Sequence, residues 1–125
     1  MGRPRILCID NDSDICELYT VVFPEFEVVS ASCRADGLHL AREGGFSLIL
    51  LEASLPDGSG EDTCETIRDF DKDTPILFIT ASQTFSELLA LYIGAQGTVR
   101  KDSKLFIEDL ISKATSLVTS PLSES

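Results

Sequence analysis

The fold is decided by the stretch Phe46-Ser-Leu-Ile-Leu-Leu-Glu-Ala-Ser-Leu-Pro-Asp-Gly-Ser-Gly60. Its apolar run, Leu48 to Leu51, is long enough for a buried strand, and the run ends in the carboxylate of Glu52. Leu55-Pro-Asp-Gly58 then gives a turn signal. Because open α/β sheets hold their sites at the carboxyl ends of the strands, this stretch predicts a site around Glu52.

Outward from this stretch, apolar runs alternate with helical patterns along the whole chain. We predict strands at Arg5–Asp10, Phe26–Ala31, Ser47–Glu52, Pro75–Thr80 and Thr98–Arg100. We predict helices from Asp12 or Ser13 to Phe23, from a Ser32 cap to Gly44, over Glu61–Phe70, over Thr84–Ile93, and after a Ser103 cap. Continuous rather than alternating apolar strands indicate a parallel sheet covered on both faces, which is a single doubly wound α/β domain. We expect the domain to occupy residues 1–119 and a flexible, Ser-rich tail to occupy 120–125.

Composition excludes several classes of protein. The formal net charge of −11 over 125 residues argues against binding to nucleic acid or to an anionic membrane, so proteins or cations are the expected partners. No run of 18 apolar residues and no signal-peptide pattern occurs, so we expect a cytoplasmic protein. The four cysteines form no C-x-x-C pair, which disfavours a zinc site and fits free thiols in a reducing compartment.

Five polar side chains are expected to meet at the carboxyl edge of the sheet: Asp10, Asn11, Glu52, Thr80 and Lys101. The oxygen atoms of Asp10, Asn11 and Glu52 suit Mg²⁺. The hydroxyl of Thr80 and the ammonium of Lys101 suit the oxygens of a phosphoryl group. A plain ion pair between the lysine and a carboxylate, closing a polar pocket, is the alternative interpretation of the same residues.

Several blocks in order resemble the receiver domain of bacterial response regulators. They are Ile6-Leu-Cys-Ile-Asp-Asn-Asp12, Leu48 to Gly60, Pro75-Ile-Leu-Phe-Ile-Thr-Ala81 and Gly94-Ala-Gln-Gly-Thr-Val-Arg-Lys101, and the similarity extends from Arg5 to about Leu117. The resemblance implies a flavodoxin-like three-layer (βα)5 fold with a parallel sheet in the order 2-1-3-4-5. It implies a signalling module of two-component phosphorelays rather than an enzyme, with Thr80 and Lys101 at the phosphate-sensing positions.

This chain departs from the family at four positions. Glu52 stands where the family has its phosphoacceptor aspartate, and Asn11 replaces the second acid of the metal pair. Thr98 replaces the aromatic switch residue, and Asp102 replaces the proline after the lysine. A cis bond before a residue other than proline costs roughly 3 kcal/mol, so we expect the Lys101–Asp102 bond to be trans.

The physical consequences of these departures predict a receiver that does not take phosphate. Glutamate is longer than aspartate, and misplacement by about 1 Å can cost on the order of a hundredfold in rate. We expect Glu52 to reach instead toward Lys101 and Thr80 and to mimic a phosphoryl group in part, with one charge where phosphate carries ~1.5 to 2. The resemblance places Mg²⁺ between Asp10, Asn11, Glu52 and the backbone of Ser54; we expect this binding to be weak or absent.

The fourth predicted helix, Phe85 to Ile93, is apolar nearly all round, more than one buried stripe needs. The surplus predicts a docking surface, and the resemblance implies that the fourth helix, fifth strand and fifth helix contact a histidine kinase or a downstream signalling protein. The residues expected on this surface are Leu88, Leu89, Tyr92 and Thr98, and the same surface would allow a homodimer. The alternative interpretation is that Tyr92 simply lies over its own neighbours on the helix.

Two other functions compete with this hypothesis. A receiver that still binds Mg²⁺ and cycles phosphate weakly is the first alternative. A small phosphatase or flavin-binding protein is the second, but the acidic residues Asp10 to Asp14 would repel a ligand's phosphate, and the turn at Asp57 offers no second acidic loop. We expect His39 to face solvent and Asp57 to serve the turn.

Overall fold

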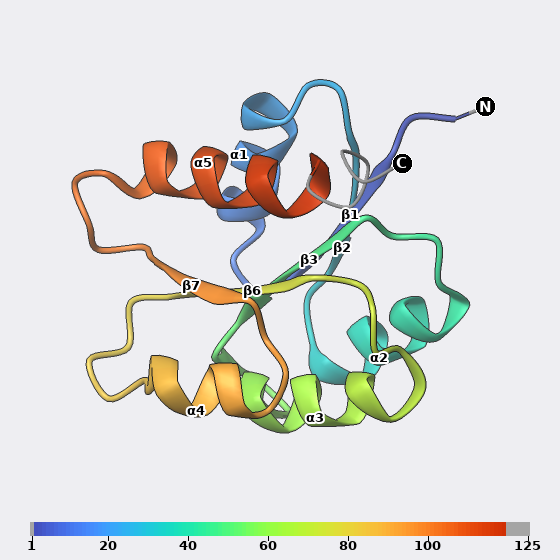
Figure 1. Ribbon diagram of the computed structural model, residues 1–125, viewed down its shortest axis with the longest axis vertical. Helices are drawn as coiled ribbons and strands as arrows, with labels where there is room; N and C mark the ends of the chain where they lie inside the picture. Colours follow the sequence, from blue (N-terminus) through green and yellow to red (C-terminus); the bar gives the residue numbers. More distant parts are fainter. Residues whose placement is uncertain (1, 120–125) are drawn as a thin grey trace.

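The computed structural model describes residues 2–119 as one five-stranded parallel sheet with helices on both faces (Figure 1). The sheet order is β2-β1-β3-β6-β7, which is the predicted order 2-1-3-4-5 when only sheet strands are counted. Its strands are β1 (Arg5–Ile9), β2 (Glu27–Ala31), β3 (Leu48–Glu52), β6 (Ile76–Thr80) and β7 (Gly97–Arg100). The helices are α1 (Ser13–Val22), α2 (Arg34–Glu43), α3 (Gly60–Phe70), α4 (Glu87–Tyr92) and α5 (Phe106–Thr119). The predicted tail 120–125 lies outside the described residues.

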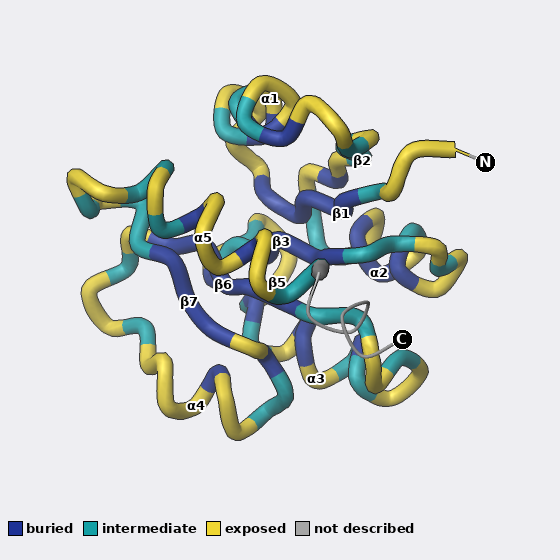
Figure 2. Tube along the Cα trace, turned by 45° about the horizontal axis from the view of Figure 1, so that its top comes forward, coloured by how far each residue is buried: buried dark blue, intermediate teal, exposed yellow. Residues whose placement is uncertain are grey.

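Two apolar clusters hold the three layers together, one on each face of the sheet. Successive residues of β3 point to opposite faces, so Leu48 and Leu50 join α1 and α5 while Ile49 and Leu51 join α2, α3 and α4. All four leucine and isoleucine side chains are at most 1% exposed. Burial therefore follows the strands through the centre of the molecule (Figure 2), as the continuous apolar run predicts. None of the helices within residues 2–119 has the length and apolar character that a membrane crossing needs.

The start of α1 follows the sequence, but the start of α2 does not. The Asp12 carboxylate accepts the first free N–H groups of α1, as one of the two predicted caps. The predicted Ser32 cap of α2 is wrong, because Cys33 holds the cap position and makes no side-chain hydrogen bond there. Instead the Asp57 carboxylate, from the loop after β3, accepts the N–H groups of Arg34 and Ala35 at 2.7 and 3.0 Å. This contact ties the loop after Glu52 to α2.

The loop after β3 is more ordered than the sequence indicated. A small antiparallel ribbon, β4 (Ser54–Leu55) and β5 (Gly58–Ser59), flanks the predicted turn and was not predicted. The helix α3 then begins at Gly60, one residue earlier than expected. A Cβ at Gly60 would lie 2.3 Å from the carbonyl oxygen of Glu52, so only glycine lets α3 start this close to the strand end.

The last two helices start later than their sequence patterns suggested. The fourth helix was predicted over Thr84–Ile93, but α4 is shorter because Ser86 caps it by accepting the N–H of Leu89. The Ser103 hydroxyl accepts the N–H of Leu105 in a turn, so it precedes α5 rather than capping it. Both differences lengthen the loops at the carboxyl edge of the sheet.

Candidate functional site

Four strands bring a cluster of charged and polar side chains to the carboxyl edge of the sheet. Asp10 follows β1, and Glu52 ends the neighbouring strand β3. Thr80 ends β6, and Lys101 follows β7. The Lys101 Nζ lies 2.8 Å from Asp10 Oδ2 and 2.5 Å from Glu52 Oε1. The predicted contact between Glu52 and Lys101 is therefore confirmed, and Asp10 completes a bridge of two carboxylates through one ammonium.

The remaining carboxylate oxygens of this bridge are also occupied. Asp10 Oδ1 accepts the N–H of Asp12 at 2.9 Å, and Glu52 Oε2 accepts the N–H of Ser54 at 3.2 Å. The side chains of Asp10, Glu52 and Lys101 are only 3, 11 and 19% exposed. Each oxygen of both acids thus has a hydrogen-bond donor, which is the condition under which buried charges are tolerated.

Burial and pairing act against each other on the ionisation of these groups. Burial raises the pKa of the Asp10 carboxyl above its usual range, although the hydrogen bond from Lys101 opposes this. Burial alone would lower the pKa of the Lys101 ammonium, but its hydrogen bonds and charge interactions with Asp10 and Glu52 outweigh burial and raise it. The lysine is therefore charged at neutral pH and balances one of the two acids.

Thr80 and Asn11 lie at the edge of this bridge without joining it. Thr80 is 1% exposed, and its hydroxyl accepts the N–H of Ser82 at 3.1 Å. Within residues 2–119, no hydrogen bond links Thr80 to Glu52, so the expected reach of the glutamate toward this hydroxyl is wrong. Asn11 is exposed beside Asp10 and makes no side-chain hydrogen bond within the same residues.

The arrangement fits a divalent cation poorly. Magnesium prefers several hard, negatively charged oxygens, but the ammonium of Lys101 already lies between the two carboxylates. Asn11 adds only a neutral amide oxygen beside Asp10. Across the described part of the chain, no three His, Cys, Asp or Glu side chains come together in a way that could hold a metal ion.

A second polar network, which the sequence did not reveal, fixes the loop between β6 and α4. Arg100 Nη1 donates to the carbonyl oxygen of Ser82 at 2.7 Å, and the guanidinium also donates to both carboxylate oxygens of Asp102 at 3.0 and 3.1 Å. Gln83 Nε2 donates to the same carboxylate at 3.0 Å. Because residues 2–119 contain no cis peptide bond, the Lys101–Asp102 bond is trans, as predicted. Asp102 thus links the loop that follows Lys101 to the loop that follows Thr80.

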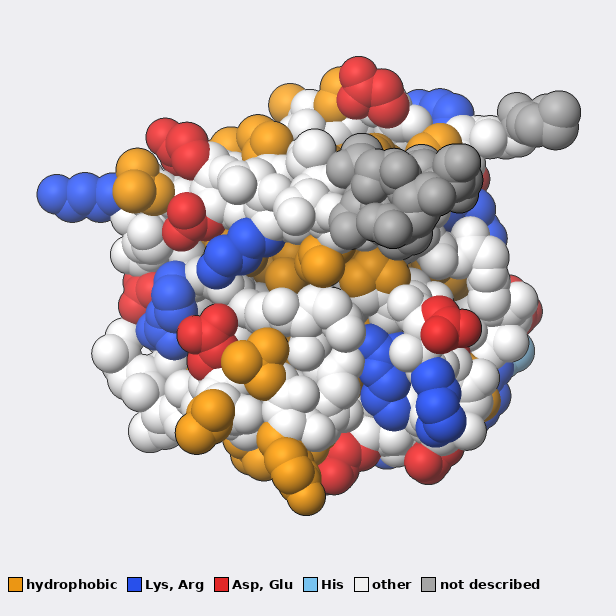
Figure 3. Space-filling model, viewed as in Figure 1, with side chains coloured by type: hydrophobic (Ala, Val, Ile, Leu, Met, Phe, Trp, Pro, Cys, Tyr) orange, Lys and Arg blue, Asp and Glu red, His pale blue; other side chains and the backbone are white. Residues whose placement is uncertain are grey.

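The expected docking residues divide between surface and interior. Leu88, Leu89 and Tyr92 of α4 are 80, 44 and 87% exposed, and Leu91 between them is 47% exposed. Figure 3 shows hydrophobic side chains gathered over this helix. Thr98 is only 7% exposed and its Oγ1 is buried without a hydrogen-bond partner, so its placement on the same surface is wrong.

The sequence model of the response regulator receiver domain family matches residues 6–114. This chain belongs to that family. The receiver domain is 31% identical over 117 residues to YkoG of Bacillus subtilis, an uncharacterized transcriptional regulatory protein, and this covers 90% of the chain but 50% of YkoG. It is also 31% identical over 100 residues to the transcriptional regulatory protein DltR of Streptococcus agalactiae, covering 78% of the chain and 45% of DltR. The chain thus spans about half the length of the curated relatives it matches.

Solved structures give the same fold for this receiver domain. A CheY-like receiver domain protein from Methanospirillum hungatei superposes with a TM-score of 0.88 at 23% identity, covering 99% of this chain and 100% of the other. A two-component response regulator from Clostridium difficile gives a TM-score of 0.82 at 28% identity, covering 93 and 96% of the two chains. Receiver domains of response regulators are generally signalling modules.

Proposed function

We propose that this receiver domain, residues 1–119, signals without accepting phosphate, with Glu52 as a permanent substitute at the phosphoacceptor position. The bridge from Lys101 to Asp10 and Glu52 is the observation that carries this proposal. An incoming phosphoryl group needs a carboxylate free to attack and an ammonium free to bind its oxygens. Here each of these groups is already the partner of the other.

The arrangement supports only a partial imitation of the phosphorylated state. Glu52 offers Lys101 one negative charge, whereas an acyl phosphate would offer more oxygens and ~1.5 to 2 charges. The Thr80 hydroxyl remains bonded to the turn at Ser82 rather than to Glu52. The lysine therefore has the contact expected in a phosphorylated domain, while the hydroxyl does not.

A Mg²⁺ titration by isothermal calorimetry tests whether the site around Asp10 and Glu52 binds the cation that phosphorylation would require. We expect no binding in the millimolar range at neutral pH, because Lys101 occupies the space between the acids and Asn11 supplies no charge. The single variant Asn11→Asp is the matched control, and it should bind more tightly since it restores one charge at an exposed position. Millimolar or tighter binding by the unchanged chain would instead favour a receiver that still cycles phosphate weakly.

The output of the domain, in this proposal, is a protein contact made by α4. Four of its six residues form an exposed apolar patch: Leu88, Leu89, Leu91 and Tyr92. A histidine kinase, a downstream signalling protein or a second copy would bury this patch, and the hydrophobic gain is roughly 25 cal/mol for each Å² removed from water.

Substitutions on α4 separate docking from folding. Leu88→Ser combined with Tyr92→Ser should leave the free energy of unfolding within about 0.5 kcal/mol of the original, because both side chains are exposed. The pair should abolish any self-association seen by sedimentation velocity and any retained partner in co-purification from the source cells. Val21→Ser, at a 73% exposed position on α1, is the control and should change neither readout. Equal loss with Val21→Ser would contradict the assignment to α4.

A further inference from the structure

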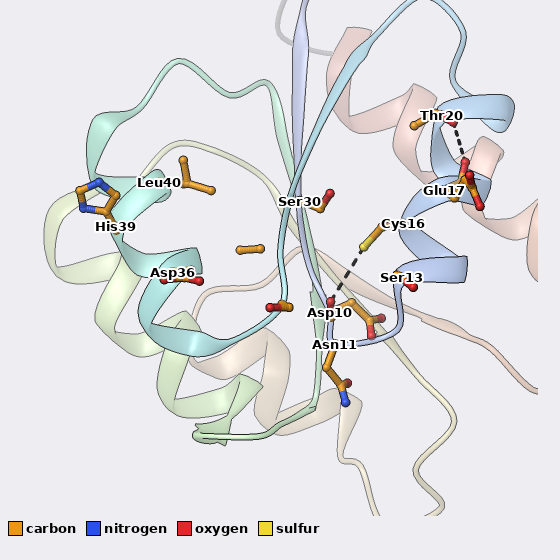
Figure 4. Close-up of a pocket in the computed structure, with 12 residues that line it drawn as sticks. Asp10, Asn11, Ser13, Cys16, Glu17, Thr20, Ser30, Asp36, His39 and Leu40 are labelled. Carbon is orange, nitrogen blue, oxygen red and sulfur yellow. Dashed lines mark hydrogen bonds between the residues drawn. The ribbon is translucent and has the colours of Figure 1, made fainter.

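The carboxyl-terminal end of β2, at Ser30 and Ala31, lines a cavity between α1 and α2 (Figure 4). The cavity has a volume of about 760 Å³ and lies beside Asp10 and Asn11. The strand β2 is the last in the sheet order, so its side away from β1 has no partner strand within residues 2–119. Since α1 and α2 cover opposite faces of the sheet, they form the walls of the cavity and leave the strand edge between them.

The pairing of β2 with β1 shows which backbone groups of β2 point away from the sheet. The N–H of Glu27 donates to Pro4 and the carbonyl of Ala31 accepts from Asp10, each at 2.9 Å. In a parallel ladder every second residue bonds to the same neighbour, so Val28 and Ser30 direct their N–H and C=O groups outward. Ser30 is exposed and lines the cavity. An unpaired row of this kind is a template for another strand.

The walls of the cavity favour a positively charged occupant. Glu17 of α1 and Asp36 of α2 lie on its two sides, and none of the described residues that line it is a lysine or an arginine. The ring of His39 contacts Glu43 at 3.3 Å on the rim. Two copies paired through β2 would bring Glu17 and Asp36 of one copy close to the same two acids of the other, and each chain carries a net charge of −11. Repulsion between like charges therefore opposes self-pairing.

We propose that this edge accepts an extended, basic segment of a partner protein, which adds to the sheet as a sixth strand beside β2. Main-chain hydrogen bonds to Val28 and Ser30 would supply affinity, and lysine or arginine side chains beside Glu17 and Asp36 would supply selectivity. This surface is separate from α4 and meets the Lys101 bridge only at Asp10, because neither Glu52 nor Lys101 is among the residues that line the cavity. The proposal therefore stands or falls independently of whether Glu52 accepts phosphate.

Peptide probes test the proposal on the full chain. The probe is a fluorescent seven-residue peptide in which valine and lysine alternate, measured by anisotropy at low salt. We expect saturable binding that weakens as salt screens the charges. A probe with glutamate in place of lysine should not bind, nor should a lysine probe whose alternate backbone nitrogens are methylated, since it cannot form the ladder. Failure of the lysine probe to bind at millimolar concentration would overturn the proposal, as would equal binding of either control probe.

Variants of the chain locate the probe on β2. Ser30→Pro removes one outward N–H without touching the ladder to β1, and an edge strand tolerates proline there. Ser30→Pro should weaken binding of the lysine probe about five- to tenfold, which is the contribution of one hydrogen bond, while Ser30→Ala should leave binding unchanged. Combining Glu17→Lys with Asp36→Lys should weaken binding of the lysine probe by about tenfold or more. If Ser30→Pro does not fold, this double variant tests the proposal in its place. Unchanged binding in these variants, or a dimer that Ser30→Pro abolishes, would overturn the proposal.

Discussion

Replacing Lys101 by methionine is expected to lower the free energy of unfolding by about 3 to 5 kcal/mol. Methionine keeps much of the volume of the lysine stem but leaves the carboxylates of Asp10 and Glu52 buried without a countercharge. Urea denaturation at neutral pH measures the loss. Adding Asp10→Asn and Glu52→Gln to the same chain is the matched control, and it should recover most of the stability because no charge then remains unpaired. A loss below about 1 kcal/mol would mean that the bridge behaves as an exposed ion pair.

The dependence of this stability on pH follows from the raised pKa of Lys101. The folded chain holds the lysine proton more tightly than the unfolded chain, so the bridge stabilises the fold below the ordinary lysine value of 10.5. That contribution is lost as the pH rises through the higher pKa of the folded state. Lys101→Met should not show this alkaline loss. Its own penalty should shrink in acid, because burial raises the pKa of Asp10 and protonation of that carboxyl removes an uncompensated charge.

Combining Glu52→Asp with Asn11→Asp is expected to convert the domain from one that takes no phosphate to one that is labelled by acetyl phosphate and Mg²⁺. The shorter side chain draws the carboxylate back from Lys101 and restores the near-attack geometry, which is worth on the order of a hundredfold for about 1 Å. The second change restores the charge that a divalent cation needs. Intact-mass spectrometry measures the fraction labelled.

The two single variants show which departure matters more. Asn11→Asp alone should improve Mg²⁺ binding without giving label, because Glu52 still bridges to Lys101. Glu52→Asp alone should give partial label, limited by the weak cation site. If the double variant binds Mg²⁺ but takes no label, then the loop fixed by Arg100 and Asp102 is a further obstacle to phosphotransfer.

The sheet and the bridge were predictable because local signals determine them. The apolar run from Leu48 to Leu51 fixes a buried central strand, and the parallel topology then brings Asp10, Glu52 and Lys101 to one edge. The residue types at that edge left a lysine–carboxylate pair as one of two interpretations, and the resemblance to receiver domains, with a longer acid at the phosphoacceptor position, led to the predicted contact between Glu52 and Lys101. Neither step required knowledge of a loop conformation.

The errors concern groups whose partners are set by loops. The sequence favoured Ser32 as a local cap, but Asp57, 22 and 23 residues away from the N–H groups it accepts, fills that role. The Thr80 hydroxyl was expected at Glu52, but in the described residues it accepts the N–H of Ser82 in the turn after β6 and makes no hydrogen bond to Glu52. The clamp of Arg100 on the loop before α4 had no sequence signal, because it depends on how two loops meet.

The most direct measurement of the central claim is the mass of the unchanged domain after incubation with acetyl phosphate and Mg²⁺ at neutral pH. The bridge between Lys101, Asp10 and Glu52 predicts no added phosphoryl group, while the double variant Glu52→Asp with Asn11→Asp becomes labelled under the same conditions. Stoichiometric, base-labile label mapped to Glu52 would contradict the account, because it would show that the glutamate leaves Lys101 and attacks a phosphodonor.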